Sequence, residues 1–269
     1  TDEFPYVWVP AKAERVLDFS ETLIISEGAE PKPLRLFPHQ CFDIGLPYGW
    51  VHRDTGFRRF RRSYLSVARQ NGKSFTNGIH GTYSAGFSGY HHGKLFTVAT
   101  KRRQAKIAWD EMKKFIEADK DLSELFRIQE WRNIIGARET GCTIEALSRE
   151  GGLDEGFRSI CTSIDELHQM KDNSIYSNLY RGTRALDETL ISMITTRGDD
   201  LDSFAFEIDK LAVNVLEGTV ELEDFFCNIY CADDTDDKFS DEALMKANPF
   251  LWNTSRGRTS LLEDAKTAQ

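Results

Sequence analysis

A short run in the first third of the chain has the composition of a phosphate-binding loop: Val67-Ala68-Arg69-Gln70-Asn71-Gly72-Lys73-Ser74. A Gly-Lys-Ser triplet between a predicted strand and a predicted helix is typical of such loops. Glycine lets backbone N–H groups face an anion, and the helix N-terminus adds the positive end of its dipole. We expect Lys73 to reach the β- and γ-phosphates of a nucleotide, and the Ser74 hydroxyl to coordinate Mg²⁺. Val67 stands where the usual pattern has its first glycine, so the match is partial.

Two adjacent acids, Asp165 and Glu166, follow the apolar stretch 159–164. Parallel α/β sheets bind their ligands at the carboxyl ends of strands, which is where this pair would lie. Asp165 is predicted to hold Mg²⁺, mostly through water, and Glu166 to act as general base toward the water that attacks the γ-phosphate. Alternatively, the pair simply opens a helix and favours its dipole. The upstream phosphate-binding loop favours the catalytic interpretation.

Two weaker signals accompany these motifs. Gln40 could pair with the N6 and N7 edge of adenine, since an amide can make both hydrogen bonds. Thr195 and Thr196 end the apolar stretch 190–196, where a hydroxyl could sense the γ-phosphate and relay hydrolysis to the segment beyond Gly198. The alternatives are a surface glutamine and the ordinary preference of threonine for strands.

The elements that must position these residues alternate between strand and helix. Strands are predicted at 64–68, 95–100, 143–147, 159–164 and 190–196, and helices at 73–84 and 103–117. This order predicts a doubly wound α/β fold with a mainly parallel sheet. After residue 198 we predict helices at 204–215, 241–247 and 259–268 and a strand at 225–231.

Three segments are expected along the chain. Residues 1–50 would be an extended lead-in that carries the adenine-binding segment, because five of the seven prolines fall in the first 38 positions. Residues 51–198 would form the nucleotide-binding core, and residues 199–269 a small lid subdomain leaning on it.

Composition narrows the class of protein. The 269 residues include 34 Lys and Arg against 43 Asp and Glu, a net charge of −9, so bulk positive charge cannot hold nucleic acid. Two basic clusters could still contact nucleic-acid phosphates locally. No membrane segment is predicted, and five scattered cysteines indicate reduced thiols. The basic clusters are Arg58-Arg59-Phe60-Arg61-Arg62 and Lys101-Arg102-Arg103.

In their order along the chain, these motifs resemble the large terminase subunit of tailed bacteriophages, the ATP-driven motor that packs viral DNA into a capsid. A missing first glycine is tolerated in that family. The resemblance implies a P-loop NTPase fold of the ASCE type with a small C-terminal lid. It extends over the segment around Gln40, Arg69-Gln70-Asn71-Gly72-Lys73-Ser74, Ile164-Asp165-Glu166-Leu167-His168, Ile194-Thr195-Thr196-Arg197-Gly198 and Ala247-Asn248-Pro249.

The resemblance also implies roles for individual residues. Glu166, Lys73 and Arg69 would be catalytic, with Arg69 touching the γ-phosphate in its own subunit. Ser74 and Asp165 would hold Mg²⁺. The implied nucleotide-binding residues are Gln40, Arg69, Gln70, Asn71, Gly72, Lys73 and Ser74.

Further implied roles concern coupling and assembly. Thr195 and Thr196 match the coupling motif of the family. A neighbouring subunit in a ring would insert an arginine finger to offset charge on the transferred phosphoryl group. Three arginines between the two nucleotide motifs are candidates, although a plain surface position is the alternative for each: Arg127, Arg132 and Arg138.

The family implies double-stranded DNA, the portal protein and the small terminase subunit as partners, and a homo-oligomeric ring, a pentamer, in the host cytoplasm during virion assembly. Family members carry a nuclease domain after the ATPase domain, and we expect this chain to be the ATPase part alone. The acids between Asp233 and Asp237 are interpreted as a solvated loop. Two alternatives remain: another P-loop DNA translocase or helicase, or a nucleotide-gated interaction module without turnover.

Overall fold

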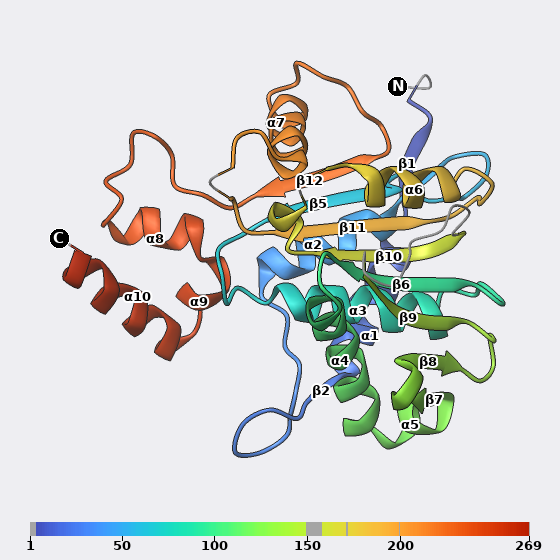
Figure 1. Cartoon of the computed structure of the whole chain (residues 1–269). Helices are drawn as coiled ribbons and strands as arrows, with labels where there is room; N and C mark the ends of the chain where they lie inside the picture. Colours follow the sequence, from blue (N-terminus) through green and yellow to red (C-terminus); the bar gives the residue numbers. More distant parts are fainter. Residues whose placement is uncertain (1–3, 149–157, 171, 199, 269) are drawn as a thin grey trace.

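An eight-stranded sheet forms the centre of the molecule in the computed structural model, which describes residues 4–148, 158–170, 172–198 and 200–268 (Figure 1). In sheet order the strands are β12 (Phe225–Ile229), β5 (Arg62–Ser66), β11 (Leu190–Thr195), β10 (Ser159–Asp165), β6 (Lys94–Ala99), β9 (Thr143–Ser148), β8 (Ile134–Ala137) and β7 (Phe126–Gln129). The strands from β12 to β9 run parallel, and β8 and β7 continue one edge in antiparallel pairing. The predicted α/β fold with a mainly parallel sheet is therefore confirmed.

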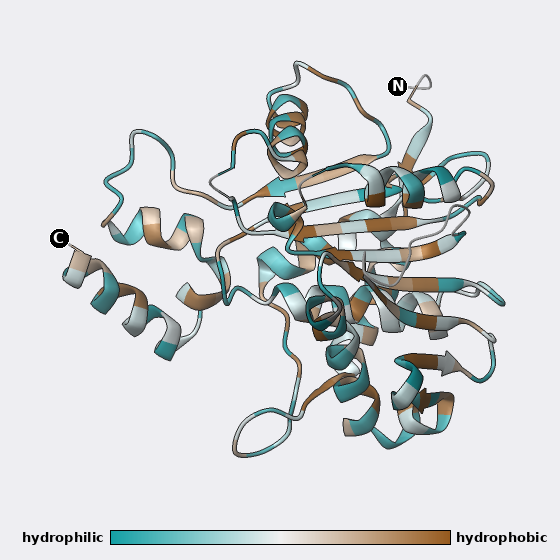
Figure 2. Ribbon diagram, viewed as in Figure 1, coloured by the Kyte–Doolittle hydropathy of each residue, from teal (hydrophilic) through white to brown (hydrophobic). Residues whose placement is uncertain are grey.

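Helices cover both faces of this sheet. One face carries α1 (Pro10–Thr22), α2 (Pro38–Gly49), α3 (Lys73–Gly86) and α4 (Arg102–Ala118). The other face carries α6 (Ser174–Gly182) and α7 (Phe204–Leu216). A short helix, α5 (Lys120–Leu125), leads from α4 to β7. Because both faces are covered, β5, β11, β10 and β6 are buried nearly throughout, and Figure 2 shows hydrophobic residues in several of these strands.

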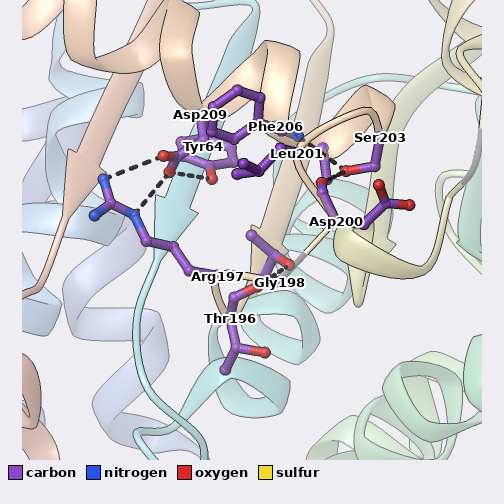
Figure 3. Close-up of a pocket in the computed structure, with 11 residues that line it drawn as sticks. Tyr64, Thr196, Arg197, Gly198, Asp200, Leu201, Ser203, Phe206 and Asp209 are labelled. Carbon is purple, nitrogen blue, oxygen red and sulfur yellow. Dashed lines mark hydrogen bonds and ion pairs between the residues drawn. The ribbon is translucent and has the colours of Figure 1, made fainter.

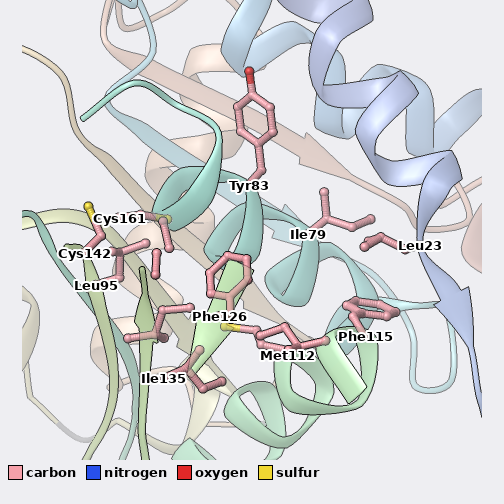
Figure 4. Close-up of a cluster of buried hydrophobic side chains, with 14 of the residues drawn as sticks. Leu23, Ile79, Tyr83, Leu95, Met112, Phe115, Phe126, Ile135, Cys142 and Cys161 are labelled. Atoms are coloured by element: carbon pink, nitrogen blue, oxygen red, sulfur yellow. The ribbon is translucent and has the colours of Figure 1, made fainter. Parts of the chain in front are cut away.

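The larger core cluster joins helices to the antiparallel end of the sheet (Figure 4). Ile79 of α3 and Met112 and Phe115 of α4 pack there with Phe126 of β7 and Ile135 of β8, all nearly inaccessible to solvent. This packing fixes α3, and with it the loop that precedes α3. No helix among the described residues has the length and apolar character needed to cross a bilayer.

The first fifty residues differ from the extended segment expected from their prolines. They form α1 and α2, and a small sheet pairs β1 (Tyr6–Trp8) with β4 (Trp50–His52). Pro10 and Pro38 each begin a helix, a position where the missing N–H costs nothing. A further pair, β2 (Ile24–Ile25) with β3 (Lys32–Pro33), lies between the helices. Two of the five prolines in the first 38 positions thus mark where helices start.

The chain beyond residue 200 is divided between the main sheet and a projecting arm. β12 pairs in parallel with β5, and α7 packs on the sheet, so the start of the expected lid shares the central core. The arm consists of α8 (Asp241–Ala247), α9 (Pro249–Trp252) and α10 (Ser255–Ala268), and it extends to one side (Figure 1). At its root Lys246 forms ion pairs with Asp233 and Asp236 of the acidic loop. No group of three or more potential metal ligands (His, Cys, Asp or Glu) occurs among the described residues.

Candidate active site

The predicted phosphate-binding loop connects β5 to α3 at the carboxyl edge of the sheet. Gln70 and Gly72 have positive φ angles of 63° and 79°, and Gly72 is the N-cap of α3. Glycine adopts this conformation without strain, whereas Gln70 does so at a cost. The first N–H groups of α3 have no helical acceptor, so this turn presents donors to an anion.

Lys73 belongs to this loop and forms no ion pair within the described residues. Its Nζ donates a 3.4 Å hydrogen bond to the carbonyl oxygen of Val67. Burial lowers the pKa of Lys73 and Arg69 lowers it further, while Glu166 and Asp165 act in the opposite direction. Within the described part of the chain, neither Lys73 nor Arg69 forms an ion pair with a carboxylate. A pocket of about 330 Å³ opens here, lined by Glu27, Arg69, Gln70, Gly72, Lys73, Ser74, Phe75, Glu111, Glu166 and Phe250.

The two predicted acids reach the same edge from β10, which is separated from β5 by β11 alone. Asp165 is the last residue of β10 and is 6% exposed. Burial, reinforced by the neighbouring Glu166, raises the pKa of Asp165 to about 6. Asp165 Oδ1 accepts a 2.9 Å hydrogen bond from the Glu166 backbone N–H, and Glu166 has a positive φ of 52°. The chain turns sharply here, which directs Glu166 into the pocket with Lys73.

His168 joins the acid pair to the predicted coupling threonines, a link that the sequence analysis did not foresee. Its Nδ1 lies 3.1 Å from Glu166 Oε2 and 3.1 Å from Thr195 Oγ1, and its backbone N–H donates to the same hydroxyl. Thr196 Oγ1 is 3.5 Å from Nδ1. The position of His168 in the sequence could have indicated this link. Because β10 and β11 end side by side, a histidine just beyond Glu166 lies close to the end of β11.

Beyond the threonines, a second pocket of about 330 Å³ lies between the end of β11 and α7 (Figure 3). Arg197 forms a 3.1 Å ion pair with Asp209 of α7, and Tyr64 of β5 donates a 2.9 Å hydrogen bond to Asp209. Thr195 and Thr196 line this pocket. The end of β11 is therefore connected on one side to Glu166 and on the other to α7.

The structure places Gln40 beside the phosphate-binding loop and Asn71 within it, and both side chains form hydrogen bonds inside the protein. Gln40 is 4% exposed and its Oε1 accepts a 3.0 Å hydrogen bond from the Phe37 N–H, which caps α2. Its Nε2 would lie 3.2 Å from a Cβ built on Gly72. Asn71 is 6% exposed and bonded to α9. The Gln40 side-chain oxygen is therefore used within the fold, and its Nε2 borders the loop at Gly72.

The three candidate arginine fingers lie elsewhere. Arg127 belongs to β7, Arg132 to a single 3₁₀ turn, and Arg138 follows β8; all three are exposed. Because β11, β10, β6 and β9 separate this edge from β5, the structure does not bring these arginines to the chain's own loop. Their action on a neighbouring subunit remains a prediction.

The basic cluster around Phe60 lies at the opposite, amino end of β5. Arg62 contacts both carboxylate oxygens of Asp224, at 2.5 and 3.1 Å. Arg59 pairs with Glu223, and Arg61 donates to two backbone carbonyl groups near the end of α6. These charges are used within the fold, whereas Lys101 and Arg103, at the start of α4, are exposed.

Comparison with known proteins gives a family match and a similar fold. A family model of the terminase large subunit ATPase domain matches residues 38–212. The crystal structure of the HK97 bacteriophage large terminase has a similar fold, with a TM-score of 0.80 and 22% sequence identity over 96% of this chain and 51% of that chain. Protein YmfN of Escherichia coli (strain K12) is 28% identical over 95 residues, which are 35% of this chain and 21% of that protein.

The chain thus spans about half the length of the HK97 protein and about a fifth of YmfN is matched. The family match runs from the start of α2 into α7 and includes the loop, both acids, Thr195 and Thr196. On this match, the chain belongs to the family of terminase large subunit ATPase domains.

Proposed function

We propose that this chain binds ATP at the loop between β5 and α3 and hydrolyses it to ADP and phosphate with Mg²⁺. One observation carries the proposal: Lys73 on the loop and Glu166 after β10 line the same pocket, with Asp165 beside them. The N–H groups of the α3 N-terminus and Lys73 would hold the phosphates. Arg69, which is exposed at the rim and unpaired within the described residues, would approach the γ-phosphate.

The residues present fit a magnesium ion. Asp165 is buried next to a second carboxylate, and both effects raise its pKa; the Glu166 backbone N–H and the charge of Lys73 offset only part of this rise. A divalent cation beside it would remove that penalty, and Ser74, on the first turn of α3, would supply a hydroxyl ligand. When bound, Mg²⁺ would neutralise charge on the β- and γ-phosphate oxygens.

Glu166 would serve as the base. A water molecule would attack the γ-phosphorus while the bond to the β–γ bridging oxygen breaks, and Glu166 would accept the proton that the water loses. Lys73 would stabilise charge on the phosphate oxygens throughout. His168 holds Glu166 and Thr195 together, so a shift of Glu166 on hydrolysis would reach β11 and then α7 through Arg197 and Asp209.

For the whole protein we propose that hydrolysis drives double-stranded DNA into a procapsid. The family membership supports this role. The chain would work in a homo-oligomeric ring, a pentamer, with the portal protein and the small terminase subunit, in the host cytoplasm during virion assembly. With a net charge of −9, DNA contact must be local, and the exposed Lys101 and Arg103 are the stronger of the two basic clusters.

The decisive experiment is steady-state ATP hydrolysis with Mg²⁺ by the native chain and by Glu166→Gln over a wide range of protein concentration. Specific activity that rises with concentration and is absent in the variant would support a shared site in a ring. Specific activity independent of concentration would mean a self-sufficient site and refute the arginine finger from a neighbour. Tight ATP binding with no turnover at any concentration would refute hydrolysis and favour a binding-only module.

A further inference from the structure

The short helix α9 is attached directly to the phosphate-binding loop by one side chain. Asn71 Oδ1 accepts hydrogen bonds from the N–H groups of Phe250, at 3.0 Å, and Leu251, at 3.3 Å. Asn71 Nδ2 donates to Asn248 Oδ1 at 3.2 Å and to the carbonyl oxygen of Arg69 at 3.0 Å. The first N–H groups of a helix lack helical acceptors. Asn71 supplies one and so caps α9, although it lies in a distant part of the sequence.

This attachment brings an aromatic ring to the pocket. Phe250 lines the same cavity as Arg69, Lys73 and Glu166. A Cβ built on Gly72 would meet Phe250 Cδ2 at 3.7 Å, so the ring lies close to the loop at Gly72. Phe37, which precedes α2, packs edge-to-face on Phe250 with ring centroids 5.5 Å apart and an interplanar angle of 72°. Phe250 is therefore held from two sides.

Asn71 makes five side-chain hydrogen bonds, including one from Nδ2 to the carbonyl oxygen of Ala68 at 3.3 Å, and all are internal to the protein, so its amide has little left for a phosphate. The resemblance to terminases implied a nucleotide contact for this residue, whereas its geometry indicates a structural bridge. The ring that it positions and the Nε2 of Gln40 both border Gly72.

We propose that Phe250 is a ligand-binding residue whose ring stacks on the nucleobase, and that Asn71 is a positioning residue that holds α9 in place for it. The inference rests on the proposed ATP site and deepens it. A planar aromatic surface beside a phosphate cradle suits a purine, and stacking on an aromatic side chain is worth about 1–3 kcal/mol per base. The projecting arm is thereby part of the site that binds nucleotide.

The test measures the contribution of the nucleobase to binding separately from that of the phosphates. Calorimetric titration of the whole chain, with Mg²⁺, would use ATP and inorganic tripolyphosphate as the two probes. Phe250→Ala should raise the Kd for ATP about 10-fold, which corresponds to about 1.4 kcal/mol, and leave the Kd for tripolyphosphate unchanged. Phe250→Trp should retain ATP affinity. Trp131→Ala, which removes an aromatic ring that is 78% exposed, serves as the matched control and should change neither Kd.

The same two probes distinguish a positioning role of Asn71 from a direct contact with phosphate. Asn71→Ala should weaken ATP but not tripolyphosphate, and adding Phe250→Ala to it should cause little further loss, because the ring is already released. Equal weakening of both probes by Asn71→Ala would make it a phosphate ligand and overturn the positioning role. A thermal melt of each variant confirms that it is folded.

The outcomes also distinguish this inference from the proposed function. If the native chain binds ATP and Phe250→Ala binds it equally well, the stacking role is refuted while the ATP site stands. If Phe250→Ala weakens both probes alike, the ring only supports the loop and the inference is again refuted. If the native chain binds neither probe, both the proposed function and this inference are refuted.

Discussion

The two ends of β5 both carry positive side chains, and they use them in opposite ways. At the amino end, Arg59 and Arg62 are paired with Glu223 and Asp224. At the carboxyl end, Lys73 and Arg69 have no carboxylate partner among the described residues, and burial lowers the pKa of Lys73. The positive side chains at the amino end of β5 are therefore paired with carboxylates, whereas those at its carboxyl end are not.

The difference separates charge that stabilises the fold from charge kept for a ligand. A paired arginine ties β5 to the start of β12, whereas an unpaired lysine over a phosphate-binding loop is left free for an anion to bind. Functional sites commonly reduce stability in this way. The comparison predicts that substitutions at one end alter catalysis and those at the other alter folding.

The largest effect is expected for Lys73→Ala. Loss of the cation that faces the phosphates should lower kcat for ATP hydrolysis by at least about 100-fold. The melting temperature should stay the same or rise, because a partly desolvated charge is removed. Hydrolysis assays and thermal melts measure the two quantities, and near-native turnover would break the comparison at its functional end.

Arg62→Ala should lower stability and leave turnover intact, the reverse of Lys73→Ala. The Arg62 side chain is 11% exposed and its partner Asp224 30% exposed, so the variant leaves a partly buried carboxylate without its cation. We expect the free energy of unfolding to fall by about 2 kcal/mol, measured by urea denaturation, with kcat per folded molecule retained. An equal loss of turnover in the folded protein would show that the amino end also serves catalysis.

A smaller, purely kinetic effect is expected for His168→Ala. Without His168, Glu166 and Thr195 lose their common contact, and we expect kcat to fall about 10-fold while KM changes little, because the nucleotide contacts remain. Gln169→Ala, in the same turn but bonded to Gln104 instead, is the matched control. A rise in KM without a fall in kcat would assign His168 to nucleotide binding.

The smallest effect concerns stability and pH at Asp165. Its pKa rises from 3.8 to about 6 on folding, so above pH 6 the ionised form costs more in the folded than in the unfolded protein. Asp165→Asn should therefore raise the free energy of unfolding by about 1 kcal/mol at pH 8, a gain that shrinks as pH falls through 6 toward 4. Unfolding measured at both pH values tests this. The exposed Asp264→Asn should show no such dependence, and a pH-independent gain would contradict the assignment.

Much of the fold could be predicted from the sequence. The strand, loop and helix around Gly72, and the acids at the end of β10, were predicted within a few residues of their observed positions. Apolar runs and glycine-marked turns are local signals, and a parallel sheet requires the carboxyl ends of its strands to lie together. The helices α1 and α2 were missed because prolines that start helices were interpreted as marks of extended chain.

The sequence by itself determined which groups are offered for chemistry: a loop that suits phosphate, a lysine, and two acids at a strand end. Only the tertiary structure decided how they are connected. Asn71 caps α9, His168 bridges Glu166 and Thr195, and Arg62 pairs with Asp224. Each of these contacts joins residues from different elements, and each depends on how those elements pack, which no local pattern of residue types encodes.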